Sequence, residues 1–411
     1  MSEYNAILGN MKKELLDSLD FTKEISDEEI QEKIDEFIVT KNKKIHLGLK
    51  EKERIRKDLF SSLRKLDILQ ELVDNPAITE IMVNGTDNIF VEKGGQIFQW
   101  ERQFHSAEKL YDVIQQIVSG CNRVVNEASP IVDARLPNGS RVNIVLNPVA
   151  LNGPVITIRR FPDQPITMDQ LIYIGSVSQE AADFLKKLVQ AKYNIFISGG
   201  TGSGKTTFLN ALSAFIPKDE RIITIEDNAE LQIQNIPNLV RLETRNANLE
   251  GCAAISIREL IKSSLRMRPD RIIVGEVRGG EAIDMMQAYN SGHDGSMSTG
   301  HANGAEDMLN RLATMILMGM DLPLTAVRQQ IASGIDIIIH LGRLRDKTRK
   351  VLEIVEIDGF EEGKICLHTL YQFEEREGRK KKEVVGELVR KGGLKNEAKL
   401  KNAGITILPC Q

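Results

Sequence analysis

The second half of the chain alternates short apolar runs with stretches in which apolar residues recur every three or four positions. The runs are rich in isoleucine and valine, which is typical of buried strands. In the stretch from Phe208 to Phe215, Leu209, Leu212 and Phe215 share one face of a predicted helix. Strands that alternate with helices predict an α/β fold with a parallel sheet and a ligand at the carboxyl ends of its strands. The strand candidates are 194–198, 222–225, 239–242, 272–274, 296–299 and 335–339.

The first part of the chain has a different pattern. Residues 1 to 75 are charged, with apolar residues at helical spacing, and predict a small helical module or a solvated helical extension. Ser26, followed three residues later by Glu29, is the pattern of a helix start in which each side chain caps the other's backbone N–H. Between residues 76 and 160, short strand-like runs, Gly-rich turns and one helical stretch, 107–119, predict an α+β domain.

Two prolines in the run Phe161 to Pro165 mark a linker, which we place at residues 161–171. The alternating domain then covers 172–373 and closes with a predicted antiparallel hairpin, 350–357 with 364–373. Residues 374–411 form a tail in which both charge signs are mixed. For this tail we expect an exposed helix or a mobile arm.

Composition and charge narrow the class of protein. The chain has 411 residues, a net charge of −4 and a pI near 6.0, so no global basic field attracts nucleic acid. No apolar run is long enough to span a bilayer, and the polar, acidic N-terminus does not read as a secretory signal, so we expect a cytosolic protein. The widely spaced cysteines predict reduced thiols, not a zinc site or disulfides. They are Cys121, Cys252, Cys366 and Cys410.

The strongest motif is the run from Gly199 to Thr206, which fits the phosphate-loop pattern of Gly, four residues and Gly-Lys-Thr. It lies between a predicted strand and a predicted helix, the context in which backbone N–H groups and the helix N-terminus bind phosphate. Lys205 can reach the β- and γ-phosphates, and the Thr206 hydroxyl can ligate Mg²⁺, so we expect ATP and Mg²⁺ to bind. The residues expected to bind the nucleotide are Gly200, Thr201, Gly202, Ser203, Gly204, Lys205, Thr206 and Thr207.

Two acidic residues follow apolar strands and suit phosphoryl transfer. Glu226 ends the run 222–226, and Glu276 follows the run 271–275. Phosphate-loop enzymes need one acid to hold Mg²⁺ and a second group to orient the attacking water. Glu276 suits the first role and Glu226 the second, although spacing alone leaves the assignment open.

Two of the six histidines, His293 and His301, lie in the Gly-rich and polar stretch 291–303. Small residues at this density suggest a backbone held close to a ligand. No third residue has suitable spacing for a metal site, and on residue type alone a structural or hydrogen-bonding role is favoured for either histidine.

Four motifs occur in one order: the phosphate loop and the stretches 223–231, 275–278 and 292–302. In this order and spacing the chain resembles the secretion ATPases of type II and type IV systems, in which these are the Walker A motif, the aspartate box, the atypical Walker B motif and the histidine box. The resemblance covers about residues 66–373 and is closest to the CpaF-like ATPases of tight-adherence (Flp/Tad) pili. A four-cysteine zinc module, carried by the pilus-extension and type II branches, does not occur here.

The resemblance implies a RecA-like phosphate-loop NTPase domain, preceded by a smaller α+β domain and an N-terminal helical module. It also implies a hexameric ring with ATP between the two domains, where arginines of the N-terminal domain reach the phosphates. The residues implied in catalysis are Glu226, Glu276, Arg278, His301, Arg135, Arg141, Arg159 and Arg160, with Thr206 and Glu276 at the metal.

We therefore expect an ATPase at the inner face of the cell membrane that drives assembly of a type IV-like pilus, or protein secretion. Its partners would be further copies of itself and an inner-membrane platform protein, with no nucleic acid. A DNA translocase or conjugation ATPase is the alternative, disfavoured by weak basicity and by the match to the histidine box. A regulatory nucleotide switch with negligible turnover is a third interpretation.

Overall fold

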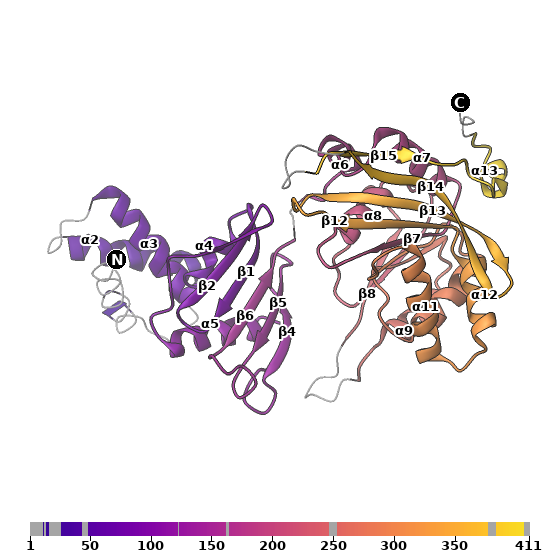
Figure 1. The fold of residues 1–411 in the computed structure, drawn as a ribbon. Helices are drawn as coiled ribbons and strands as arrows, with labels where there is room; N and C mark the ends of the chain where they lie inside the picture. Colours follow the sequence, from indigo (N-terminus) through magenta and orange to yellow (C-terminus); the bar gives the residue numbers. More distant parts are fainter. Residues whose placement is uncertain are drawn as a thin grey trace. The chain divides into compact units, whose positions relative to one another are not determined.

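The computed structural model describes residues 11, 14–15, 26–42, 48–121, 123–161, 164–245, 253–376 and 384–406. The expectations for Cys252, Cys410 and the linker residues Pro162 and Asp163 fall outside these residues. The chain divides into two compact units, Met1–Asp163 and Gln164–Gln411, which Figure 1 shows in indigo to purple and in magenta to yellow.

The first unit combines helices with an antiparallel sheet. Ser26 and Glu29 form the expected capping box, since each backbone N–H donates to the other side chain at 3.1–3.2 Å. The described strands form one sheet in the order β3-β2-β1-β6-β5-β4. The elements are α2 (Asp27–Asn42), α3 (Leu49–Arg64), α4 (Leu69–Val73), β1 (Ile78–Asn84), β2 (Asn88–Lys93), β3 (Gln96–Gln99), α5 (Ala107–Ser119), β4 (Ile131–Arg135), β5 (Arg141–Val145) and β6 (Val155–Arg159).

One face of this sheet is buried against α4 and α5. Strand residues alternate between the two faces, and the inward positions are apolar, such as Val142 and Ile144 on β5. The outward positions are mostly polar. The alternation explains why short strands could be predicted here without any long apolar run. The edge strand β3, which is exposed throughout, was not predicted.

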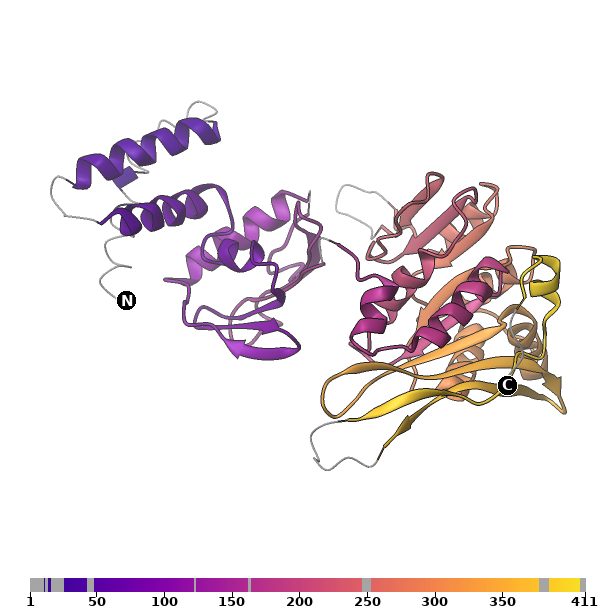
Figure 2. The same ribbon diagram turned by 90° about the horizontal axis from the view of Figure 1, so that it is seen from above.

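The second unit is built on a mixed sheet in the order β15-β14-β13-β12-β7-β11-β10-β8-β9. The strands from β12 to β9 are parallel, and β13, β14 and β15 extend the sheet as antiparallel strands. Figure 2 shows the long β13–β14 hairpin that the sequence predicted. The strands are β7 (Ile195–Gly199), β8 (Ile222–Glu226), β9 (Leu239–Glu243), β10 (Arg271–Val274), β11 (Met297–Gly300), β12 (Ile337–Arg343), β13 (Arg349–Glu361), β14 (Lys364–Glu375) and β15 (Gly386–Arg390).

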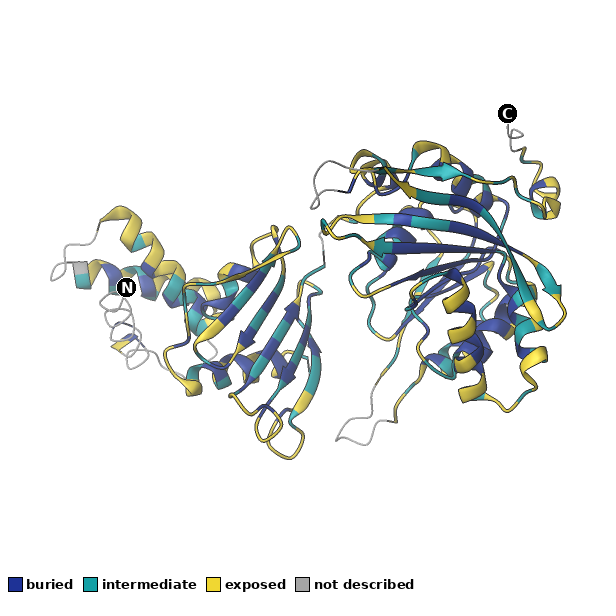
Figure 3. Cartoon of the chain, in the orientation of Figure 1, coloured by how far each residue is buried: buried dark blue, intermediate teal, exposed yellow. Residues whose placement is uncertain are grey.

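Helices cover both faces of this sheet. One apolar core joins α6, α7 and α8 to one face, and a second joins α9, α10, α11 and α12 to the other. The central strands are therefore buried on both sides, as the dark blue strands in Figure 3 show. The helices are α6 (Met168–Tyr173), α7 (Gln179–Gln190), α8 (Lys205–Ser213), α9 (Ile257–Ser264), α10 (Ala282–Tyr289), α11 (Ala305–Gly319), α12 (Leu324–Gly334) and α13 (Ala398–Asn402).

The fold class expected from the sequence is confirmed, but the expectation for the tail is wrong. Within the predicted tail, β15 pairs with β14, and Leu400 of α13 is buried. Buried Glu356 accepts the backbone N–H groups of Lys395 and Asn396 at 2.8 and 2.7 Å. The mixed charges of this segment do not predict a strand from the sequence, because such a strand is favourable only when it pairs with a neighbouring strand.

Candidate nucleotide site

Four neighbouring parallel strands place the predicted residues at one edge of the second sheet. The strands β7, β11, β10 and β8 are adjacent in that order. The phosphate loop follows β7, His301 follows β11, Glu276 lies two residues after β10, and Glu226 ends β8. Because all four strands run in the same direction, these groups gather at their carboxyl ends, where ligands bind in open α/β sheets.

The phosphate loop connects β7 directly to α8. Its last glycine, Gly204, has a φ of 95° and precedes the first helical residue, Lys205. A side chain would strain this backbone, so glycine allows the loop to turn into the helix with its N–H groups directed inward. Thr206 and Thr207 follow in the first turn of α8, whose amino end carries partial positive charge.

Lys205 is almost buried, with 7% of its surface exposed, and its ammonium group lies inside the loop. Its Nζ donates to the carbonyl oxygens of Gly199 and Gly200 at 3.1 and 3.2 Å. It also lies 3.3 Å from His301 Nδ1. A triphosphate would offer stronger, charged acceptors for this ammonium group.

His301 joins Lys205 to Glu276. The ammonium group can only donate, so Nδ1 accepts and Nε2 carries the proton. Nε2 lies 2.8 Å from Glu276 Oε1, a close contact without hydrogen-bond geometry, since Oε1 is buried without a hydrogen-bond partner among the described residues. Desolvation, followed by the charge of Lys205, lowers the pKa of His301. The imidazole is thus held neutral, in a defined tautomer, between a cation and a carboxylate.

Glu276 is fixed from both sides. Its Oε2 accepts from Arg278 Nη2 at 2.7 Å, and this hydrogen bond raises the pKa of the arginine. The neighbouring strands are tied together, because Thr299 Oγ1 donates to Gly275 O at 2.8 Å and Val277 N–H donates to Thr299 O at 3.0 Å. The carboxylate that the sequence predicted at the metal therefore lies between His301 and Arg278, after a strand that is tied to β11.

Glu226 is buried, with 3% of its surface exposed. Desolvation raises its pKa to about 7, although Oε1 accepts the N–H groups of Leu231 and Glu230 at 2.8 Å each. Its second oxygen, Oε2, is buried without a hydrogen-bond partner among the described residues. A buried carboxylate oxygen in this state suits a water or a hydrated Mg²⁺.

The four predicted arginines lie in the first unit. Arg135, Arg141 and Arg159 are directly opposite one another on β4, β5 and β6, and Arg160 follows β6. Like charges in a cross-strand row repel, which is unfavourable unless an anion or acid compensates them. Two acids balance this charge: Asp133 Oδ1 lies 3.5 Å from Arg141 Nη2, and Glu80 on β1 lies directly opposite Arg159.

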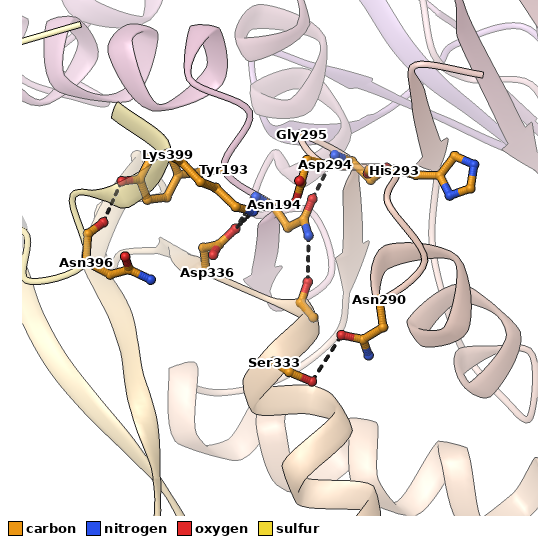
Figure 4. Close-up of polar contacts among 12 residues, drawn as sticks. Tyr193, Asn194, Asn290, His293, Asp294, Gly295, Ser333, Asp336, Asn396 and Lys399 are labelled. Carbon is orange, nitrogen blue, oxygen red and sulfur yellow. Dashed lines mark hydrogen bonds and ion pairs between the residues drawn. The ribbon is translucent and has the colours of Figure 1, made fainter. Parts of the chain in front are cut away.

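The structure separates the two histidines of the Gly-rich stretch. His301 follows the carboxyl end of β11, whereas His293 precedes its amino end. There, Lys399 bridges Asp294 and Asp336 at 2.7 Å each, and the His293 ring points away from these contacts (Figure 4). His293 is thus placed at the opposite edge of the sheet, away from the phosphate loop.

Two groups of residues beside the loop were not expected. The polar face of α11 lines a cavity of about 520 Å³ together with Gly200, Thr201 and His301. A second cavity, of about 240 Å³, lies between the loop and the turn that joins β12 to β13. The unexpected polar residues are Asp307, Asn310, Arg311 and Thr314 in the first cavity and Lys347, Thr348, Arg349 and Lys350 in the second. The helical spacing of these four residues among themselves, just after His301, could have indicated the first group, but no sequence signal indicates the second.

Fold and site together define a RecA-like phosphate-loop NTPase. The described residues contain no cluster of three or more His, Cys, Asp or Glu side chains that could hold a metal without the nucleotide. Cys121 and Cys366 are free thiols. No helix in the described part of the chain is long and apolar enough to cross a membrane.

Comparison with known proteins identifies the family. The sequence model described as "Type II/IV secretion system protein" matches residues 62–392. The type IV secretion system protein PtlH of Bordetella pertussis is 35% identical over 323 residues, which cover 72% of this chain and 94% of PtlH. The conjugal transfer protein TrbB of Rhizobium radiobacter is 32% identical over 313 residues, covering 75% of this chain and 93% of TrbB.

A solved structure supports the fold. The ATPase DotB of Legionella pneumophila aligns with a TM-score of 0.52 and 22% identity, over 71% of this chain and 80% of DotB. The chain therefore belongs to the type II/IV secretion ATPase family, as the order of its motifs indicated.

Proposed function

We propose that this protein hydrolyses Mg-ATP and uses the energy to drive secretion or pilus assembly at the inner face of the cell membrane. The observation that carries the proposal is the contact chain from Lys205 through His301 to Glu276. It joins the phosphate loop to a fixed carboxylate through a neutral imidazole. A cation, an imidazole and an acid that converge beside a phosphate loop are groups that phosphoryl transfer uses.

The roles of the site residues follow from their chemistry. The loop N–H groups and Lys205 bind the β- and γ-phosphates, and the Thr206 hydroxyl and Glu276 hold Mg²⁺. When bound, Mg²⁺ neutralises charge that develops on the phosphates. Glu226, whose Oε2 has no partner among the described residues, orients the attacking water. Arg278 positions Glu276, and His301 responds to the γ-phosphate.

The arginines of the first unit supply further positive charge. We propose that Arg135, Arg141, Arg159 and Arg160 close over the phosphates, as the family resemblance implies. Three of them lie in one cross-strand row, next to Asp133 and Glu80, and could add positive charge at an anionic ligand. The unit Met1–Asp163 then acts as the N-terminal domain and Gln164–Gln411 as the ATPase domain. Nucleotide-dependent closure of one domain on the other would couple chemistry to motion.

We further propose a hexameric ring that acts on an inner-membrane platform protein. The family supports a role in secretion machinery, and the similarity to PtlH, a type IV secretion system protein, supports the same class. Within this class, we propose the Flp/Tad pilus branch, to which the resemblance is closest; the four cysteines are too widely spaced for the zinc module of the pilus-extension and type II branches.

Conjugation is the second candidate. TrbB, which matches over most of its length, is a conjugal transfer protein. The net charge of −4 is unfavourable for a protein that would bind DNA directly, so secretion or pilus assembly is preferred over conjugation.

Steady-state phosphate release from Mg-ATP tests the proposal. The wild-type chain is expected to turn over, Lys205→Ala to lose activity with an unchanged melting temperature, and Lys218→Ala, at an exposed lysine, to match wild type. Binding without turnover would establish a switch instead. Stimulation by DNA would favour conjugation.

In the host cell, Lys205→Ala should abolish surface pili, whereas loss of secreted protein with intact pili would favour secretion.

A further inference from the structure

The turn between β12 and β13 touches the phosphate loop. Arg349, the first residue of β13, donates from its Nε to the carbonyl oxygen of Gly202 at 2.8 Å, across 147 residues of sequence. Gly202 lies in the middle of the loop. One side chain from a distant hairpin therefore contacts the backbone that is expected to surround the phosphates.

This contact fixes the orientation of a peptide group. The carbonyl of Gly202 and the N–H of Ser203 belong to one peptide unit and point in opposite directions when it is trans. With the carbonyl held by Arg349, the Ser203 N–H is directed into the loop, where it donates to Gly200 O at 3.3 Å. Lys205 Nζ donates to the same oxygen at 3.2 Å. Two donors are thus already directed to the place where a phosphate would accept them.

The backbone around Arg349 is held by hydrogen bonds to the segment that follows α6. Its carbonyl oxygen accepts from the Ser176 hydroxyl at 2.8 Å, and Val351 N–H donates to Ser176 O at 2.8 Å. Lys350 Nζ donates to Gly175 O at 2.7 Å. Ser176 is buried. The start of β13 is therefore attached to the segment after α6, and the exposed side chain of Arg349 extends from it to the loop.

We propose that Arg349 is a positioning residue that holds the Gly202–Ser203 peptide in the orientation required for phosphate binding. The inference rests on the proposed nucleotide-binding function of the same loop. Arg349 acts through the loop backbone, because its Nε bonds to the carbonyl that points away from the Ser203 N–H. By holding the Gly-rich loop in its binding conformation before the nucleotide arrives, Arg349 lowers the free-energy cost of ordering the loop on binding.

Arg349→Ala and Arg349→Lys, made in the full chain, test this role, with Arg345→Ala as the matched control. Arg345 lies in the same turn but pairs with Glu375 instead of the loop. In calorimetric titrations we expect Arg349→Ala to weaken ADP and ATP binding about 10-fold, as for one lost hydrogen bond to a charged group. The turnover number should change much less, Arg349→Lys should recover part of the affinity, and Arg345→Ala should match wild type.

Hydrogen exchange without nucleotide separates this inference from the proposed function. Arg349→Ala should accelerate exchange of the Ser203 N–H, and Arg345→Ala should not. If the wild type fails to bind ATP but this difference is found, the proposed function is wrong and the positioning role stands. Unchanged nucleotide affinity and unchanged exchange in Arg349→Ala would overturn the inference, as would equal losses in Arg345→Ala.

Discussion

The ammonium group of Lys205 lies 3.3 Å from Nδ1 of His301, although 96 residues separate them in the sequence. When a triphosphate draws the ammonium group toward its own oxygens, His301 loses a donor to Nδ1. On its other side, the imidazole lies with Nε2 2.8 Å from Glu276 Oε1. We propose that His301 communicates nucleotide binding at the loop to Glu276, which follows the neighbouring strand β10.

His301→Ala should lower the turnover number of ATP hydrolysis about 10- to 100-fold with little change in ATP affinity, since the imidazole lies beside Lys205 but not within the loop. His293→Ala is the control, because His293 precedes the other end of β11. Turnover and binding should be measured separately. Wild-type turnover in His301→Ala, or stoichiometric zinc that this substitution removes, would contradict the assignment.

Glu276→Gln should still bind ATP but hydrolyse it about 100-fold more slowly, because the amide keeps the shape of the side chain and loses its charge. Equilibrium binding of ATP and single-turnover rates distinguish the possible roles. Loss of ATP binding would make Glu276 chiefly a metal ligand. If neither property changed, the carboxylate would only terminate its strand, with Arg278 as an incidental partner.

Glu226 should make stability depend on pH. Its pKa is about 7 in the folded chain, against 4.5 for an ordinary glutamate. Between these values the folded state retains a proton that the unfolded state has lost, so stability falls as pH rises from 4.5 to 7 and then levels off. Between pH 4.5 and 8, the free energy of unfolding of Glu226→Gln should rise by up to about 3 kcal/mol relative to that of wild type. One pKa unit corresponds to about 1.4 kcal/mol.

Urea unfolding of wild type and Glu226→Gln at both pH values measures this difference. Glu127→Gln, at an exposed site, controls for the loss of one negative charge. If the difference in free energy of unfolding between wild type and Glu226→Gln is the same at both pH values, burial does not raise the pKa of this carboxyl.

Arg141→Ala should slow hydrolysis at least 10-fold while leaving the free energy of unfolding nearly unchanged. Arg141 lies between Arg135 and Arg159, so its removal relieves repulsion that offsets the weak pairing with Asp133. ADP binding should change less than turnover, since the cation is proposed to act at the γ-phosphate.

The same comparison applies to Arg135, Arg159 and Arg160, with Arg56→Ala on α3 as the control for loss of a charge in the first unit. A nucleotide-bound structure in which all four arginines point to bulk solvent would refute this set.

The sequence by itself determined the fold class and the main parts of the site. Alternating apolar runs and helical stretches predict a doubly covered sheet, because burial on both faces requires continuous apolar strands. The phosphate loop could be identified because its glycines and Lys205 are neighbours in the sequence, so the whole motif is visible in one short run. Glu226, Glu276 and His301 could be placed at strand ends for the same reason.

The tertiary structure alone decided which of these residues touch. The strand order β7-β11-β10-β8 differs from the chain order, so it brings His301 between Lys205 and Glu276. Arg349 could not be assigned to the phosphate loop from spacing, since the contact depends on where the β12–β13 turn lies. The tail was misjudged for a related reason. A charged strand such as β15 is favourable only beside the edge that β14 offers, and that edge exists only in the folded sheet.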